Sequence, residues 1–94
     1  MAYNLASVMN RIVWHNRARK QMKKIPEAYR ESIFQKVDSL EQFPEHGLSD
    51  IKKLKNHDYD YRLRVGPYRV MFDFKDGIKI IAIQEVRKRD ERTY

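Results

Sequence analysis

The segment from residue 59 to residue 72 most constrains what this chain can fold into, because its apolar and charged residues alternate. A period of two places successive side chains on opposite faces of a β-strand. One face would hold Tyr59, Tyr61, Leu63 and Val65, and the other Asp60, Arg62 and Arg64. Gly66-Pro67 then interrupts the pattern, and an apolar run follows in which Arg69 is the only charged residue up to Phe72. The segment predicts a β-hairpin that carries three arginines.

The rest of the chain predicts two helices and two more strands. Strands are expected at residues 11–15, 59–65, 68–74 and 78–87, and helices at residues 16–24 and 26–42. Asn16 is a predicted N-cap, and Pro26 fits the first position of the second helix. Steps of three and four residues give that helix one apolar stripe: Tyr29, Ile33, Phe34, Val37 and Leu40. The order β-α-α-β-β-β indicates an α+β fold, with two helices on one face of a mostly antiparallel four-stranded sheet.

Length and composition exclude several classes of protein. The 94 residues have the size of one small domain, and we expect residues 1–94 to form it, with 1–10 as an N-terminal extension. The chain has no cysteine, so a disulfide framework and a zinc–thiolate site are excluded, and its three histidines lack a metal-ligand spacing. We therefore expect no metal and no cofactor. Without a signal peptide or the ~20 apolar residues of a membrane helix, a cytoplasmic location without a membrane partner is predicted.

The charge of the chain is high and unevenly distributed. The net charge is +7, which favours nucleic acid or an acidic protein as a partner. Residues 1–26 carry six basic residues and no acidic one, whereas residues 27–50 carry six acidic and two basic residues. Residues 51–94 are basic again. This pattern predicts a folded domain with one positive and one negative face.

Four segments in this order carry a resemblance to a known family. They are Ile12-Val13-Trp14 before the basic helix, Lys53-Leu54-Lys55, the hairpin from Tyr61 to Val70, and the basic closing segment from Val86 to Tyr94. Together they resemble the RelE/ParE superfamily of bacterial toxin–antitoxin toxins over residues 11–94. RelE-like members are ribosome-dependent endoribonucleases that cut mRNA in the decoding site. ParE-like members share the scaffold and inhibit DNA gyrase.

The resemblance is closest to the RelE-like members, because the chain keeps basic residues on the hairpin and final strand and a terminal tyrosine. It implies a metal-independent endoribonuclease that cleaves translated mRNA and so inhibits translation. The alternative is a ParE-like gyrase inhibitor, or a catalytically worn nucleic-acid-binding member of the same scaffold. The fold alone does not separate these functions.

The resemblance also implies a catalytic set, namely Asp60, Arg62, Arg69, Arg89 and Tyr94. RNA cleavage without a metal needs a base for the 2′-hydroxyl, cations for the phosphorane-like state and an acid for the leaving oxygen. Arg62 and Arg69 would stabilise the transition-state charge, and Arg89 the leaving group. Tyr94 would stack on a base, orient the 2′-hydroxyl or exchange a proton. The base is Asp60, Tyr94 or neither, because an arginine with a pKa above ~12 keeps its proton.

A second set is expected to contact RNA or the ribosome: Arg64, Lys53, Lys55, Arg87, Lys88, Arg17 and Lys20. Binding to phosphates needs only such a display of basic side chains. The alternative is an ordinary solvated surface, on which Arg62 and Arg64 pair across the sheet with Asp73 or Glu85.

Partners follow from the resemblance and from the charge. The family implies a cognate antitoxin, whose acidic or amphipathic segment would cover the basic face. The ribosome, through 16S rRNA, and mRNA are the other expected partners. DNA would be contacted only indirectly, through the antitoxin.

Overall fold

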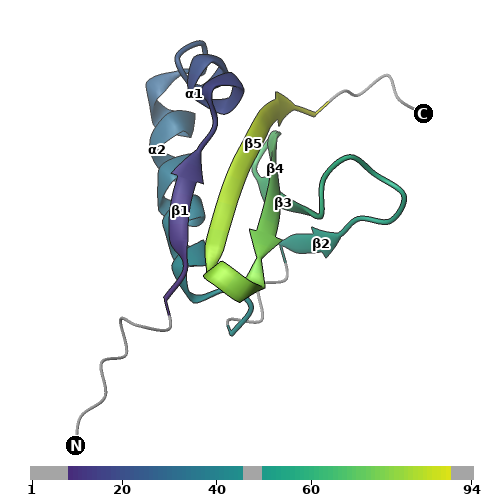
Figure 1. The fold of residues 1–94 in the computed structure, drawn as a ribbon. Coiled ribbons are helices and arrows are strands. Elements are labelled where there is room, and N and C mark those ends of the chain that lie inside the picture. Colours follow the sequence, from purple (N-terminus) through teal and green to yellow (C-terminus); the bar gives the residue numbers. More distant parts are fainter. Residues whose placement is uncertain (1–8, 46–49, 90–94) are drawn as a thin grey trace, which may run out of the picture.

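The computed structural model describes residues 9–45 and 50–89. Its helices are α1 (Asn16–Met22) and α2 (Glu27–Asp38), and the 3-10 turn η2 (Ser39–Gln42) continues α2. Its strands are β1 (Arg11–Trp14), β2 (Ile51–Lys53), β3 (Tyr61–Val65), β4 (Tyr68–Lys75) and β5 (Ile80–Lys88), with the 3-10 turn η3 (Asp76–Ile78) between the last two. The strands form one sheet in the order β1-β5-β4-β3-β2, and both helices lie on one side of it (Figure 1).

The predicted α+β class, the element order and the position of both helices on one face are confirmed, but the sheet has five strands where four were predicted. The missed strand is β2, which lies in the segment predicted as an irregular connection. Its three residues, Ile51–Lys53, are too short and too polar for a recognisable pattern, and pairing with β3 makes them a strand. β1 pairs parallel with β5, and the other neighbours are antiparallel.

The helix boundaries also differ in detail from the prediction. His15, and not Asn16, occupies the N-cap position of α1, without a side-chain cap. The second helix is α-helical only to Asp38 and tightens into η2 over the remaining residues. Two residues of its predicted stripe, Tyr29 and Phe34, are 44% exposed, and their rings make T-shaped contacts with Tyr68 and Trp14, respectively.

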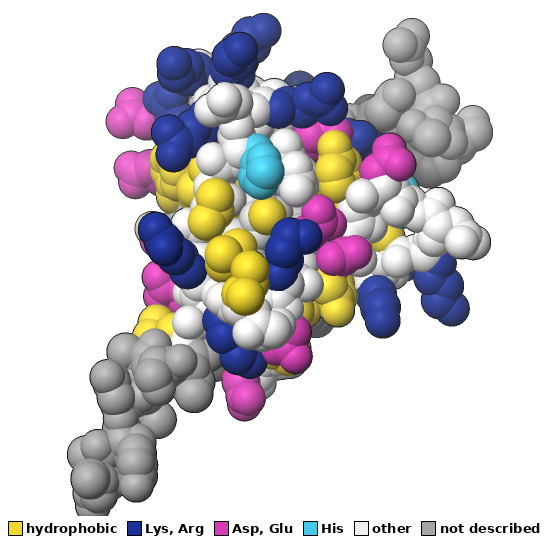
Figure 2. All heavy atoms as spheres, in the orientation of Figure 1, with side chains coloured by type: hydrophobic (Ala, Val, Ile, Leu, Met, Phe, Trp, Pro, Cys, Tyr) yellow, Lys and Arg dark blue, Asp and Glu magenta, His cyan; other side chains and the backbone are white. Residues whose placement is uncertain are grey.

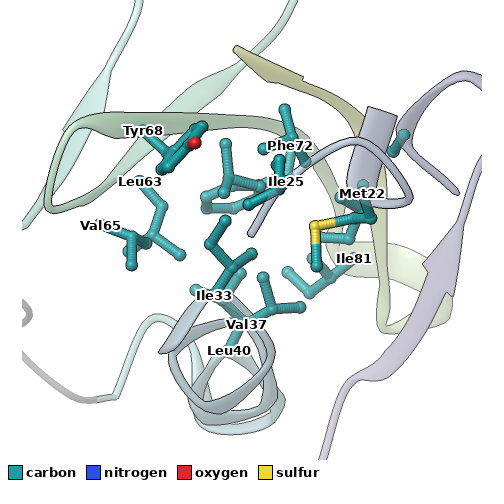
Figure 3. Close-up of a cluster of buried hydrophobic side chains, with 14 residues drawn as sticks. Met22, Ile25, Ile33, Val37, Leu40, Leu63, Val65, Tyr68, Phe72 and Ile81 are labelled. Carbon is teal, nitrogen blue, oxygen red and sulfur yellow. The ribbon is translucent and has the colours of Figure 1, made fainter. Parts of the chain in front are cut away.

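The hydrophobic core fills the space between the helices and one face of the sheet. In Figure 3, Ile33, Val37 and Leu40 point from the α2 segment toward the sheet residues Leu63 and Phe72. All five are fully buried. Burial of a large aliphatic or aromatic side chain stabilises the fold by roughly 1.5–3 kcal/mol, so this layer supports the helix-covered face. The opposite face of the sheet, called the open face below, carries the alternate residues of β3, β4 and β5.

α1 covers the edge of β5 beyond the end of β1. β1 pairs with β5 only as far as Trp14 and Ile83, which leaves the backbone of residues 84–88 without a strand neighbour on that side. Gln21 on α1 supplies a hydrogen-bond partner for this backbone, because its Oε1 accepts a bond of 2.6 Å from the N–H of Val86. The basic helix is thereby fixed beside the end of the sheet. Within the described residues, neither helix is long and apolar enough to cross a membrane.

Candidate functional site

Three arginines lie side by side in one row across the open face. The strand register pairs Arg64 on β3 with Arg69 on β4, and Arg69 in turn with Arg87 on β5. Directly paired residues of an antiparallel sheet share a face, and like charges in such positions destabilise the sheet. We call Arg64, Arg69 and Arg87 the arginine row. A fold that keeps three unfavourable neighbours in this way presents a concentrated site for an anion, for which guanidinium groups are suited.

The turn between β3 and β4 fixes the middle of the row. Gly66 has a φ of 54°, a left-handed conformation that glycine adopts without steric cost, and Pro67 follows it. Nη1 of Arg69 donates to the carbonyl oxygens of Gly66 and Tyr68, at 2.8 and 2.9 Å. The backbone N–H of Arg89 donates to the carbonyl of Pro67 at 2.7 Å. The turn therefore holds the guanidinium of Arg69 and the backbone of Arg89 at the same end of the sheet.

A buried carboxylate, Glu85, supports the outer arginine of the row. Glu85 is 6% exposed and occupies the next row of the open face, in register with Met71. Its oxygens accept two bonds from Arg87, at 2.9 and 3.0 Å, and one from Arg17 of α1 at 3.1 Å. The Tyr59 hydroxyl donates a further bond of 2.7 Å. The hydrogen bonds from Arg87 and then Tyr59 outweigh the effect of burial and lower the pKa of Glu85 to about 2.

A second carboxylate, Asp50, holds the other end of the row. Arg64 Nη2 donates to Asp50 Oδ1 at 2.9 Å, and Lys36 of α2 binds the other oxygen. These bonds lower the pKa of Asp50, with Lys36 as the larger cause. Arg64 therefore has an ion-pair partner, but it is Asp50 and neither Asp73 nor Glu85, the partners that an ordinary strand face predicted.

The predicted catalytic residues are only partly brought together. Arg62 lies in the second row with Met71 and Glu85, next to the arginine row. Asp60 lies two rows from Arg69, about 13 Å along the strand. Its carboxylate accepts a bond from the backbone N–H of Phe74 at 3.3 Å, and its own N–H donates to Asp73 Oδ1 at 2.8 Å. Tyr94 lies outside the described residues.

The predicted binding residues divide between the two faces. Arg17 joins the open face through Glu85, and Lys20 lies one turn further along α1. Lys53 and Lys88 pair with Tyr61 and Tyr68, so they belong to the helix-covered side of the sheet. Lys55 is exposed in the loop after β2. Lys52, which was not predicted as a site residue, is in register with Arg62 and adds a cation to the open face.

Basic side chains continue from the arginine row over α1. Figure 2 shows lysine and arginine side chains gathered over α1 and the end of the sheet beside it. A hollow of about 300 Å³ in this region is lined by Arg17, Lys20, Gln21 and Lys24. Among the residues that the structure describes, no three His, Cys, Asp or Glu side chains gather closely enough to hold a metal ion.

Glu85, Tyr59 and Asp50 are the residues of this site that sequence reasoning missed. Tyr59 was predicted only as an apolar strand residue, and Glu85 only as a partner for Arg62 or Arg64. The signal for Glu85 was an acidic residue in a mostly apolar strand, from Ile80 to Val86, because a buried charge is retained only when it is paired. Its partners could not be named before the register of β5 was known.

Comparison with known proteins identifies the family. Residues 12–93 match the family described as the ParE toxin of the type II toxin–antitoxin system parDE. The protein named RelE1 in Methanocaldococcus jannaschii is 30% identical over 77 residues, or 81% of this chain and 86% of that protein. In the crystal structure of the archaeal RelE–RelB complex from Pyrococcus horikoshii, one chain is 28% identical with a TM-score of 0.74, and the match covers 88% of this chain and 98% of that one.

The isolated RelE toxin of E. coli has the same fold, with a TM-score of 0.61 at 22% identity, over 87% of this chain and 86% of that one. The family match extends from β1 to β5 and includes both helices. The matches confirm the resemblance that the sequence carries. The chain belongs to the ParE toxin family of type II toxin–antitoxin systems, within the RelE/ParE superfamily.

Proposed function

We propose that this toxin is a ribosome-dependent, metal-independent endoribonuclease that cleaves translated mRNA. The observation that carries the proposal is the arginine row, Arg64–Arg69–Arg87, on the open face. Three adjacent guanidinium groups match the charge of an RNA phosphate and of the dianionic state through which its cleavage passes. A toxin that acted only by binding gyrase would have no need to keep three like charges in register.

The chemistry that we propose uses the side chains alone. The 2′-oxygen attacks the phosphorus, the bond to the 5′-oxygen breaks, and the 2′-proton is lost while the leaving oxygen gains one. Arg69 and Arg62 would stabilise the charge on the phosphorus, and Arg89 the leaving oxygen. Arg64, Arg87 and Arg17 would bind the flanking phosphates. Stabilisation of developing charge by fixed donors commonly contributes more to such catalysis than any other single effect.

The general base has less support. Asp60 is about 13 Å along the strand from the row, beyond the hydrogen-bond distance at which a base acts. Glu85 is nearer but is a poor base, because its pKa of about 2 reflects an anion held by two arginines. We therefore favour catalysis by charge stabilisation and by positioning of the mRNA on the ribosome, with proton exchange by Tyr94 as the second possibility.

We also propose a cognate antitoxin as partner. The Pyrococcus horikoshii relative was crystallised as a RelE–RelB complex, and the net charge of +7 in this chain favours an acidic segment as the ligand. An antitoxin that covered Arg64 and Arg87 would hide the groups that RNA needs. The ribosome, through 16S rRNA, is the proposed site of action.

The test compares two triple variants that lose the same charge. Arg64→Ala/Arg69→Ala/Arg87→Ala removes the arginine row, and Arg19→Ala/Lys23→Ala/Arg30→Ala removes three cations from the helix-covered side. Each variant and the wild type is expressed in cells, and new mRNA ends are mapped by primer extension on an abundant translated message. We expect growth arrest and new ends with the wild type and the helix-side variant, and neither with the row variant.

Growth arrest with intact mRNA would contradict the proposal. The ParE family match then directs attention to gyrase, and the same variants would be scored for inhibition of DNA supercoiling. Thermal melting of the three purified proteins shows whether loss of activity in the row variant reflects loss of the fold.

A further inference from the structure

Tyr59 is held across the open face by its hydroxyl group. The residue lies in the loop between β2 and β3, and its hydroxyl donates to Glu85 Oε2 at 2.7 Å. Glu85 is on β5, two strands away, so the phenol must reach across β4. Since Glu85 shares the open face with Met71, the ring lies over that face and is fixed at both ends, by the backbone and by the hydroxyl.

The other described aromatic side chains of the Phe, Trp and Tyr types are occupied elsewhere. Tyr61, Phe72 and Phe74 pack against Phe43, with ring centroids 5.0–5.6 Å apart. Tyr68 packs on Tyr29, and Trp14 on Phe34, on the helix-covered side. Within residues 9–45 and 50–89, Tyr59 is thus the only Phe, Trp or Tyr residue whose ring lies on the open face.

The position of Tyr59 relates it to the arginine row. Its hydroxyl meets Glu85 in the row of the sheet next to Arg87, about 7 Å along the strand. The ring of His57 lies beside it, with centroids 5.8 Å apart, and His57 Nδ1 accepts a bond from the backbone N–H of Tyr59. When an RNA phosphate binds the arginine row, the base of the same nucleotide is therefore within reach of the flat, fixed ring of Tyr59.

We propose that Tyr59 is the stacking platform for one nucleobase of the single-stranded RNA whose phosphate binds the arginine row. The proposal rests on the function proposed above. Splayed bases of single-stranded RNA are recognised by stacking on aromatic side chains. A ring that is already fixed in place loses little conformational freedom on binding.

The hydrogen bond to Glu85 also favours a role for Tyr59 in stacking over a role in proton transfer. The bond occupies the hydroxyl and, as the largest cause, raises the pKa of Tyr59 above its usual value. Tyr59 therefore keeps its proton and offers the substrate its ring face. It would favour a base by stacking strength and not by hydrogen-bond readout.

The experiment measures cleavage of short mRNAs on programmed ribosomes under single-turnover conditions. One mRNA is intact, and three others each carry one abasic nucleotide in the decoded codon. Wild type, Tyr59→Phe and Tyr59→Leu are compared. We expect the loss of one particular base to slow the wild type and Tyr59→Phe by about 10- to 100-fold. Tyr59→Leu should be slowed similarly on intact mRNA and should lose little more when that base is absent.

The outcomes separate the two proposals. If the effects of Tyr59→Leu and of each abasic substitution on the cleavage rate are independent of one another, the stacking proposal is wrong and the nuclease proposal stands. If the wild type does not cleave the intact mRNA, the nuclease proposal is wrong and the stacking proposal falls with it. Thermal melting identifies a variant that fails to fold. In that case Tyr59→Trp replaces Tyr59→Leu, and its larger ring should increase the dependence on the same base; an unchanged dependence overturns the proposal.

Discussion

Replacement of Arg69 by alanine is expected to reduce mRNA cleavage by about 100- to 1,000-fold, the usual effect of removing one fixed donor from a developing anion. Arg69 is the middle of the arginine row and has Arg64 and Arg87 as its direct strand neighbours. The substitution therefore removes the central positive charge of the row, between Arg64 and Arg87. Cleavage rates of purified protein on programmed ribosomes measure the effect.

Two controls make this result specific to charge and geometry. Arg69→Lys keeps the charge but loses the planar fork, and we expect an intermediate rate. Arg19→Ala, on the helix-covered side, should leave the rate unchanged. Thermal melting of Arg69→Ala is measured beside the rate, because the variant relieves repulsion in the row but loses the hydrogen bonds to the carbonyls of Gly66 and Tyr68. A cleavage rate within threefold of the wild type would contradict the role assigned to Arg69.

Replacement of Glu85 by glutamine is expected to lower the free energy of unfolding at neutral pH by about 3–4 kcal/mol. The pKa of Glu85 falls from 4.5 to about 2 on folding, and each unit corresponds to about 1.4 kcal/mol. For a domain of this size, the loss corresponds to a decrease of about 15–30 °C in Tm. Glu31→Gln, which removes an exposed acidic group from the middle of α2, serves as the control and should change Tm little.

The pH dependence of stability tests the same residue independently. A carboxyl whose pKa is lowered by folding stabilises the folded state fully above the unfolded value of about 4.5, and this contribution is lost as the pH falls toward 2. Denaturant unfolding between pH 6 and pH 2 should therefore show a steeper acid decline for the wild type than for Glu85→Gln. Parallel curves for the two proteins would show that Glu85 does not carry this stabilisation.

Most of the fold could be predicted from the sequence, because local patterns specify it. Three patterns have a direct structural meaning. The alternation through residues 59–65 predicts a strand, Gly66-Pro67 predicts a turn, and the spacing of Ile33, Val37 and Leu40 predicts one face of a helix. β2 could not be predicted in this way. A three-residue strand gains its hydrogen bonds from a neighbour, and no property of Ile51–Lys53 alone indicates which neighbour that is.

The arginines of the candidate site could be named from the sequence, but their arrangement could not be predicted. The hairpin indicated that Arg62, Arg64 and Arg69 would be close, since two paired strands are enough for that. The alignment of Arg69 with Arg87 depends on the β4–β5 register, which a bulge after Met71 shifts. A bulge changes which residues share a row and leaves no reliable sequence signal. Asp60 was assigned from the family resemblance, and its spacing of four residues from Arg64 places it two rows from the arginine row.

The parallel pairing of β1 with β5 has a consequence for biosynthesis. It joins the beginning of the domain to its last strand, a contact of long sequence separation, and such contacts form slowly because a large loop must close first. The arginine row also needs β5, since Arg87 contributes to it. A chain that is still emerging from the ribosome has neither a closed sheet nor a complete row. We infer that the arginine row forms late in folding, only once β5 has left the ribosome and paired with β4.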